Sequence, residues 1–280
     1  MNATSKLFIF IAAAALWWGC GEGKMEKARV KGNSVTSIPV STWEKLSSMR
    51  IYFGHQSVGY NIVQGIQDLM ADNPEIRLNL MDIKDGKPPE GGGVFGHGTI
   101  GKNQQPETKL EDFRKRLDEG PNRRIDMAML KFCYVDVVDG TDVDILFNKY
   151  KTRMDEIKAS NPGILIIHST IPLITDSPSI KNAIKRLLGR GESSCGENKK
   201  KNEYNELLLK EYGGKEPVFD IARIESTRPD GTRITCTKDG KMFFCLDPDF
   251  TYDGGHLNAK GRKVVAAHLL TLLAELAEKN

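Results

Sequence analysis

The chain carries little net charge for its length. Its 280 residues include 40 basic and 37 acidic side chains, which leaves a net charge of +3. No strong field is therefore available to attract nucleic acid or an anionic bilayer, and we expect no nucleic-acid partner. Hydrophobic residues make up 39% of the chain. That fraction allows a sizeable buried core and argues against disorder throughout.

The apolar run near the N-terminus is too short to span a bilayer comfortably. The segment "LFIFIAAAALWW" follows Lys6 and has the length of the apolar region of a signal peptide. Gly19 and Cys20 at its end resemble a bacterial lipobox, in which the cysteine is lipidated and becomes the mature N-terminus. The alternative is a plain secretory signal with an incidental cysteine.

These features divide the chain into three parts. We expect a signal peptide at 1–20, a polar flexible tether at 21–42 and one folded domain at 43–280. The protein is then exported to the cell envelope and anchored by lipid to a membrane that faces the periplasm or the exterior.

Cysteine is scarce, with five residues in the chain. Export places the four beyond Cys20 in an oxidising space, where disulfides persist and three complete pairings are possible. Cys236 and Cys245 flank an Asp239-Gly240 hairpin turn, so these two can approach each other diagonally. We expect Cys133, in an apolar strand, to be a free buried thiol.

Short apolar runs alternate with helical patterns from about residue 50 onward. The runs predict strands at 50–53, 76–81, 125–132, 164–168 and 218–221. The helical patterns lie at 58–70, 107–118, 143–159, 180–188, 202–212 and 258–278, and glycine-rich segments at 85–107 and 189–202 are predicted as loops. This alternation predicts an α/β fold with a single doubly wound, mainly parallel sheet and helices on both faces.

Polar side chains follow several of the predicted strands. In open parallel sheets, ligands bind outside the carboxyl ends of the strands. The residues expected at that edge are His55, Ser57, the loop 97–103, Tyr134, Asp136, His168 and the segment "TYDGGHLN" before the last helix.

The most specific stretch is "YDGGHLNAKG". Asp253 precedes His256 by three residues on a turn, so its carboxylate can accept the imidazole Nδ1 proton and leave Nε2 facing a nucleophile. The alternative is an Asp cap beside an ordinary surface histidine. Ser57 lies where the first strand turns into a helix, a position that exposes Oγ and offers free amides for an oxyanion. Ser57 can also serve as the helix N-cap, and the two roles are compatible.

The chain resembles the SGNH, or GDSL-type, hydrolase superfamily from about Arg50 to its C-terminus. "DGGHLNAKG" resembles the last block of that family, and Ser57 follows the first strand as the family's nucleophile does. The resemblance implies a flavodoxin-like fold, ester hydrolysis by a catalytic triad of Ser57, Asp253 and His256, and no cofactor or metal.

Two family blocks are altered. "GHQS" stands where the family has Gly-Asp-Ser, and in "CYVD" Val135 replaces the oxyanion-hole asparagine while Asp136 matches the block's last residue. As replacement donors we expect the Gly101 backbone amide, which resembles the second block, and the Asn103 side chain. His55 is expected to line the substrate pocket.

The sequence therefore predicts a serine esterase that removes acyl groups, acetyl above all, from an envelope or extracellular carbohydrate. One alternative is a noncatalytic glycan-binding lipoprotein on the same fold. Another is a metal-dependent hydrolase that uses His55, His97 and His168 near Asp136, Asp253 and His256.

Overall fold

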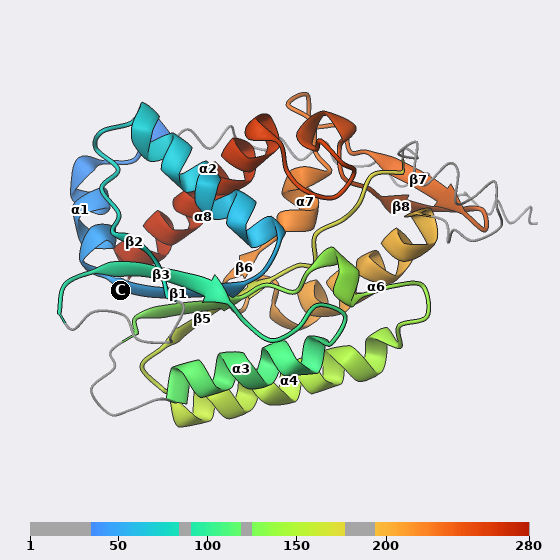
Figure 1. Ribbon diagram of the computed structural model, residues 1–280, viewed down its shortest axis with the longest axis horizontal. Helices are drawn as coiled ribbons and strands as arrows, with labels where there is room; N and C mark the ends of the chain where they lie inside the picture. Colours follow the sequence, from blue (N-terminus) through green and yellow to red (C-terminus); the bar gives the residue numbers. More distant parts are fainter. Residues whose placement is uncertain (1–34, 84–90, 119–124, 177–193, 280) are drawn as a thin grey trace, which may run out of the picture.

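Six parallel strands form the centre of the molecule (Figure 1). The structure, a computed structural model, describes residues 35–83, 91–118, 125–176 and 194–279. The strand order is β2-β3-β1-β4-β5-β6. The strands are β1 (Arg50–His55), β2 (Leu80–Asp82), β3 (Val94–Thr99), β4 (Met127–Leu130), β5 (Leu165–Ser169) and β6 (Val218–Phe219).

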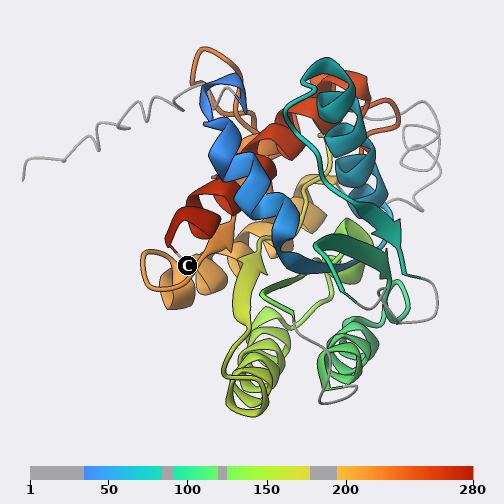
Figure 2. The ribbon, with the colours of Figure 1, turned by 90° about the vertical axis from the view of Figure 1, so that its left-hand side faces the viewer.

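Helices cover both faces of this sheet, as Figures 1 and 2 show. One face carries α1 (Val40–Ser48), α2 (Val58–Asp72), α7 (Ile221–Glu225) and α8 (Ala259–Lys279). The other carries α3 (Pro106–Asp118), α4 (Val143–Ser160) and α6 (Ser194–Tyr212). The predicted α/β fold with a doubly wound parallel sheet is confirmed.

Successive side chains along each strand point to opposite faces of the sheet and so contribute to the hydrophobic core on each face. In β1, Ile51 and Phe53 point into the core under α2 and α8, and Tyr52 points into the core over α3 and α4. In the neighbouring β4, Met127 and Met129 join the first core, while Ala128 and Leu130 join the second. Both strands are buried on both faces, which explains their nearly continuous apolar sequence.

The strand order reverses direction at β1. The chain runs from β1 to the edge strand β2, returns through β3 to pair with one side of β1, and then crosses to β4 on its other side. The carboxyl end of β1 therefore lies between the loops that follow β3 and β4. That is the crevice where doubly wound sheets bind ligands.

Three predicted boundaries differ from the structure. The segment 85–107, predicted as a loop, contains the central strand β3, and α6 begins at Ser194 inside the predicted loop 189–202. The predicted strand 76–81 is reduced to β2 at Leu80–Asp82. The helix predicted at 180–188 lies outside the described residues.

The folded unit begins before the expected boundary at residue 43. The short helix η1 (Val35–Ser37) and the start of α1 fall in the expected tether. Val35, Trp43 and Leu46 are buried in the core with α8. The expected signal peptide, Cys20 and the tether up to residue 34 lie outside the described residues. Within the described residues, none of the helices is long and apolar enough to cross a bilayer.

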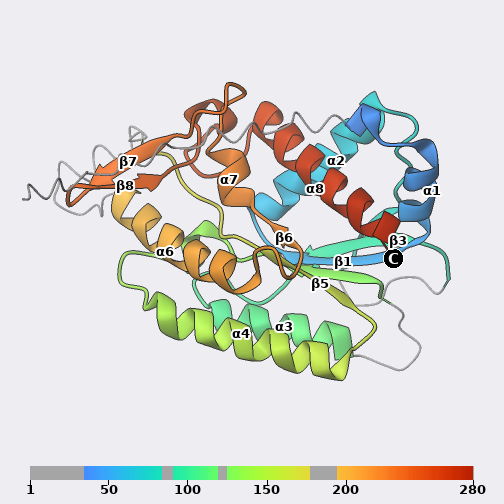
Figure 3. The same ribbon diagram turned by 180° about the vertical axis from the view of Figure 1, so that it is seen from behind.

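A separate two-stranded hairpin lies beside α6, away from the central sheet (Figure 3). It consists of β7 (Thr235–Lys238) and β8 (Lys241–Phe244), joined at the predicted Asp239-Gly240 turn. Cys236 forms a disulfide with Cys195 of α6, with 5.8 Å between the Cα atoms. Cys245 lies in the same buried cluster as Cys236, in line with the expected approach of these two residues, but it is not bonded to Cys236. Cys236 is opposite Phe243 in the hairpin register, and α6 packs across the hairpin. Cys245 and Cys133 are free and buried, the latter as predicted.

Candidate active site

The turn between β1 and α2 holds Ser57 in an unusual backbone conformation. Its φ is 53° and its ψ is −112°, a region that costs about 1–3 kcal/mol for a residue with a side chain and persists only where the surroundings enforce it. Ser57 occupies the N-cap position of α2, but its side chain makes no capping hydrogen bond. The hydroxyl is therefore directed to a different partner.

That partner is a histidine from the far end of the chain. Ser57 Oγ lies 2.6 Å from His256 Nε2, as the prediction required. On the other side of the ring, His256 Nδ1 lies 2.7 Å from Asp253 Oδ2. This arrangement fixes a tautomer in which Nδ1–H donates to the carboxylate and Nε2 accepts from the serine hydroxyl.

Asp253 is held by the turn in which it lies. Its Oδ1 accepts the backbone amides of Gly255 and His256 at 3.0 and 2.8 Å. Burial acts to raise the pKa of Asp253, but the hydrogen bonds from the His256 amide, the His256 ring and the Gly255 amide outweigh it and hold the pKa below its ordinary value. The carboxylate is thus charged at neutral pH and able to stabilise an imidazolium.

Thr251 and Asn258 fix the two ends of this turn. The Thr251 hydroxyl donates to the His256 carbonyl at 2.6 Å and accepts from the Gly254 amide at 2.9 Å. Asn258 accepts the Gly261 amide at the start of α8 and donates to the Asp249 carbonyl. The asparagine that opens the final helix therefore ties the histidine turn to that helix.

Close packing of α2 on α8 brings the two ends of the chain together. A Cβ on Gly65 of α2 would lie 2.2 Å from the Arg262 carbonyl oxygen, so a glycine is needed for this approach. Arg262 also pairs with Asp68 of α2 at 2.7 Å, and the Asn61 side chain accepts the Leu257 amide. The serine at the start of α2 and the histidine before α8 are positioned by these same contacts.

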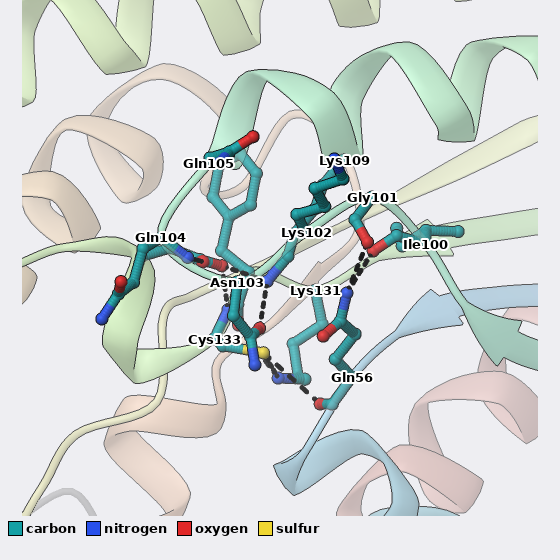
Figure 4. A network of polar contacts seen from close by, with 12 residues as sticks. Gln56, Ile100, Gly101, Lys102, Asn103, Gln104, Gln105, Lys109, Lys131 and Cys133 are labelled. Carbon is teal, nitrogen blue, oxygen red and sulfur yellow. Dashed lines mark hydrogen bonds and ion pairs between the residues drawn. The ribbon is translucent and has the colours of Figure 1, made fainter.

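Gln56, which precedes the serine, is anchored to the loop after β3 (Figure 4). Its side-chain amide donates to the carbonyls of Ile100 and Gly101 at 2.7 and 2.8 Å. Its own carbonyl accepts a contact from the Cys133 thiol at 3.5 Å. Gln56 therefore links the loops of the three adjacent strands and helps to enforce the Ser57 backbone. The sequence reasoning gave Gln56 no role, because its partners are backbone atoms that no motif records.

The structure corrects the role expected for Gly101. Its amide donates to Asp112 of α3 at 2.9 Å and its carbonyl accepts from Gln56, so both of its backbone groups are already engaged. Gly101 has a φ of 51°, and a Cβ there would lie 2.4 Å from the Lys109 backbone nitrogen. This glycine permits close packing of the loop on α3 and does not present its amide to an oxyanion.

Asn103 lies between Lys109 and the contact of Cys133 with Gln56, as Figure 4 shows. Its Oδ1 accepts from Lys109 Nζ at 2.9 Å. An ammonium group can only donate, so this bond determines which end of the amide is the oxygen and leaves Nδ2 directed away from the lysine.

Asp136 is a buried structural residue, which corrects the expectation that it contacts substrate. Its side chain is fully buried and pairs with the equally buried Lys109 at 2.5 Å. It also accepts the backbone amides of Cys133 and Gln104 at 2.7 and 2.8 Å. Asp136 thus joins the loop after β4 to the loop after β3 and has no surface to offer a ligand.

The three candidate histidines do not gather at the triad. His55 is fully buried, with Nε2 3.2 Å from His97 Nδ1, so it does not line a pocket as expected. Burial lowers the pKa of His55, with His97 and Lys131 adding to the effect. Burial likewise lowers the pKa of His97, against an opposing contribution from Asp82. His168 is buried elsewhere, between Tyr150 and Glu216.

The donor groups do not favour a metal centre. In the part of the chain that the structure describes, one group of side chains has ligand atoms close enough to hold an ion, and it consists of Asp176, Cys195 and Cys236. Both cysteines of that group are joined in the disulfide. Oxidised sulfur has no thiolate to offer, so these residues do not fit a metal site.

A cavity of about 320 Å³ adjoins the turn that holds Asp253 and His256, called the triad turn below. Its walls come from the triad turn, η2 (Tyr134–Asp136), the segment after β5 and the start of α6. They are lined by Gln104, Tyr134, Val135, Val138, Ile174, Thr175, Ser194, Glu197, Asp253, Gly254 and Gly255. Tyr134 also lies beside His256, with ring centroids 5.6 Å apart in an edge-to-face arrangement. The sequence placed Tyr134 at this edge of the sheet because it follows a predicted strand, but gave it no specific role.

Comparisons with known proteins give matches among solved structures. No family model and no curated protein sequence matches the chain. A GDSL-like lipase from Bacteroides thetaiotaomicron has 16% identity and a TM-score of 0.48, over 88% of this chain and 94% of that one. An acetyl xylan esterase has 15% identity and a TM-score of 0.45, over 79% and 98%.

A carbohydrate esterase of family 3 from Talaromyces cellulolyticus has 13% identity and a TM-score of 0.43, over 83% of this chain and 98% of that one. At such identities the likeness concerns the fold alone. By their descriptions, the solved structures to which this chain is similar in fold include a GDSL-like lipase and two carbohydrate-directed esterases.

Proposed function

We propose that the protein is a serine esterase that transfers an acyl group from an ester to water. The observation that carries this proposal is the 2.6 Å separation of Ser57 Oγ and His256 Nε2, two groups 199 residues apart in the sequence. The strained Ser57 backbone and the orienting carboxylate of Asp253 support it. A nucleophile, a base and a group that orients the base are the parts that acyl transfer needs.

The reaction follows from these three side chains. Ser57 Oγ attacks the ester carbonyl while His256 Nε2 takes its proton, and Asp253 stabilises the resulting imidazolium. His256 then gives the proton to the leaving alcohol, which leaves an acyl group on Ser57. Water attacks this intermediate with the same histidine as base, and Ser57 regains its proton as the carboxylic acid departs.

The Ser57 amide and the Asn103 side chain are the proposed oxyanion donors. Within the described chain, the Ser57 backbone N–H donates to no carbonyl, and it lies at the start of α2, where the helix dipole favours negative charge. Lys109 holds the Asn103 oxygen and so turns the amide nitrogen away from itself. Together these donors would replace the asparagine that is absent at Val135.

The adjoining cavity favours a small acyl group on a neutral, hydroxyl-bearing substrate. Its volume of about 320 Å³ is at the small end of ligand pockets. The lining includes the carboxylates of Glu197 and Asp253 and no basic side chain among the residues that the structure describes. Anionic substrates are therefore disfavoured, while Gln104, Thr175 and Tyr134 offer partners for sugar hydroxyls. An acetylated carbohydrate fits this surface.

Two measurements with one variant test the proposal. The purified protein should hydrolyse p-nitrophenyl acetate and should be labelled at Ser57 by a fluorophosphonate. Ser57→Ala should lose both, with a rate reduced by about 10³-fold or more. Ser48→Ala, which removes an exposed hydroxyl in α1 that bonds only its own helix, should keep both. An unlabelled, inactive wild-type protein refutes the esterase.

A noncatalytic glycan-binding protein is the second candidate, and the engaged amide of Gly101 is the observation that favours it. Under that hypothesis, Ser57→Ala should bind acetylated oligosaccharides as well as the wild-type protein does, and neither should release acetate. Isothermal titration combined with an acetate assay separates the two hypotheses.

We also propose that the protein acts outside the cytoplasm. The disulfide between Cys195 and Cys236 supports this location, because such bonds persist in oxidising compartments. In the proposed form, Cys20 carries a lipid that holds the domain at the envelope. Metabolic labelling with an alkyne fatty acid should mark the wild-type protein and not Cys20→Ala, and label in both would refute the anchor.

A further inference from the structure

Tyr134 is a polar side chain beside His256 that takes no part in the proton transfers proposed for Ser57, His256 and Asp253. It follows β4 as the first residue of η2, one position before the valine that replaces the family's asparagine. Its hydroxyl lies 3.5 Å from Nδ1 of His256, the histidine whose Nε2 is 2.6 Å from Ser57 Oγ. Ser57, as a hydrogen-bond partner, acts to lower the pKa of Tyr134. The phenol therefore lies beside the pair of side chains between which the proton moves in the proposed reaction.

The surrounding turn is shaped to admit this tyrosine. A Cβ on Gly255 would lie 2.8 to 3.0 Å from three atoms at the hydroxyl end of the Tyr134 ring, so any larger residue would push that end away from the triad. The ring also packs edge-to-face against His256. The second glycine of "DGGH" thus preserves the space that the phenol occupies beside His256.

We propose that the Tyr134 hydroxyl is a catalytic hydrogen-bond donor to Ser57 Oγ. This inference rests on the proposed esterase function. The donor acts in both half-reactions, since Ser57 Oγ gains negative charge as its proton moves to His256 and again when the acyl–oxygen bond breaks. Hydrogen bonds aimed at an oxygen where charge develops are among the larger contributions to enzymatic rates.

The proton inventory of the cycle is unchanged by this role. In acylation the Ser57 proton goes to His256 and then to the leaving alcohol. In deacylation a water proton goes to His256 and then to Ser57 Oγ. Tyr134 keeps its own proton throughout, because burial, with the Asp253 carboxylate next in importance, raises the pKa of Tyr134 to about 12.

The phenol contributes both a ring that packs and a hydroxyl that donates, and Tyr134→Phe removes only the second. We expect this variant to retain the thermal unfolding temperature of the wild-type protein. Its kcat for p-nitrophenyl acetate and its rate of inactivation by a fluorophosphonate should both fall by about 10²-fold, with KM nearly unchanged. Tyr60→Phe is the matched control, because the Tyr60 hydroxyl bonds Thr99 at the protein surface, and it should keep wild-type rates.

A second variant tests the donor itself. Replacement of Tyr134 by 3,5-difluorotyrosine keeps the shape and makes the phenol more acidic. The rate of hydrolysis should then fall at alkaline pH to the level of Tyr134→Phe, because the phenol loses its proton. The wild-type protein should show no such alkaline limb, that is, no decrease in rate over the same pH range.

The outcomes separate this inference from the proposed function. A wild-type protein that hydrolyses the ester beside an equally active Tyr134→Phe overturns the role of Tyr134 and leaves the esterase standing. A difluorotyrosine protein without the alkaline limb also overturns it. If the wild-type protein neither hydrolyses esters nor reacts with the fluorophosphonate, the esterase and the role of Tyr134 fail together.

Discussion

Two groups of charged side chains near the candidate site differ in their exposure to solvent: Asp253 with His256, and Lys109 with Asp136. The side chains of Asp253 and His256 retain 42% and 30% of their solvent exposure, whereas those of Lys109 and Asp136 have none. An exposed carboxylate is only weakly coupled to folding, while a buried pair must remain complete because either charge alone is poorly solvated. This difference supports the proposal that Asp253 and His256 take part in the chemistry, whereas Lys109 and Asp136 fix the loops around them.

The largest expected effect comes from a change confined to the exposed group. Asp253→Asn should lower kcat for a small ester by about 10³–10⁴-fold, because the amide no longer holds His256 in the tautomer that accepts the Ser57 proton. Thermal unfolding should change little. Asp249→Asn, at a carboxylate whose side chain is 70% exposed, is the control. Comparable losses of rate in both variants would contradict the assignment.

A change in the buried pair of Lys109 and Asp136 should instead mainly lower the stability of the protein. Asp136→Asn leaves the Lys109 ammonium without its counter-charge and should reduce the free energy of unfolding by about 3–5 kcal/mol. Asp139→Asn breaks a partly exposed pair with Lys238 and should cost at most about 1 kcal/mol. Urea unfolding measures both. Equal stability of the two variants would contradict the structural role assigned to the buried pair of Lys109 and Asp136.

The disulfide extends the comparison to the hairpin. Replacing both Cys195 and Cys236 by serine should cost about 2–4 kcal/mol, since the bond closes a loop with a sequence separation of 41 residues. The reductant dithiothreitol should destabilise the wild-type protein and leave the double variant unaffected. Alkylation after denaturation without reductant should label Cys133 and Cys245. Labelling of Cys195 would refute the pairing.

The smallest effect concerns pH. The pKa values of His55 and His97 are lowered in the folded protein, so the unfolded chain binds more protons as the pH falls below about 6.5. Stability should therefore decrease from pH 7 towards pH 5, by at most about 1.4 kcal/mol per pH unit for each proton. His55→Asn should make the free energy of unfolding less dependent on pH. Part of the dependence should remain, because the pKa values of His97, His168 and His268 are lowered as well. An unchanged slope in the variant would contradict the interpretation.

The elements that could be predicted from the sequence are those with local signals. Apolar runs such as "AMLKF" identified buried parallel strands, and the three-residue spacing of Asp253 and His256 identified a turn able to orient an imidazole. The strand-to-helix turn at Ser57 was likewise visible, but the positive φ of Ser57 itself was not.

Other elements depend on contacts that no local pattern records. The strand β3 was missed because its "VFGHGT" sequence is rich in glycine, which is rare in strands. A Cβ on Gly98 would lie 2.9 Å from the Ile83 carbonyl oxygen, so tertiary packing selects a glycine that lowers the strand propensity. Lys109 was also missed, since a lysine in the first turns of a charged helix gives no sign that it will be buried.

The separation of Ser57 from His256 along the chain has a consequence for biosynthesis. The serine directly follows β1, the first strand of the sheet to be translated, whereas its proposed base lies just before the last helix. Helix α2 must dock on α8 before the two can meet. A nascent polypeptide halted ahead of Thr251 would carry the nucleophile without any means of activating it. Reactivity of the hydroxyl thus reports completion of the fold, and a fluorophosphonate would mark finished molecules while passing over their translational precursors.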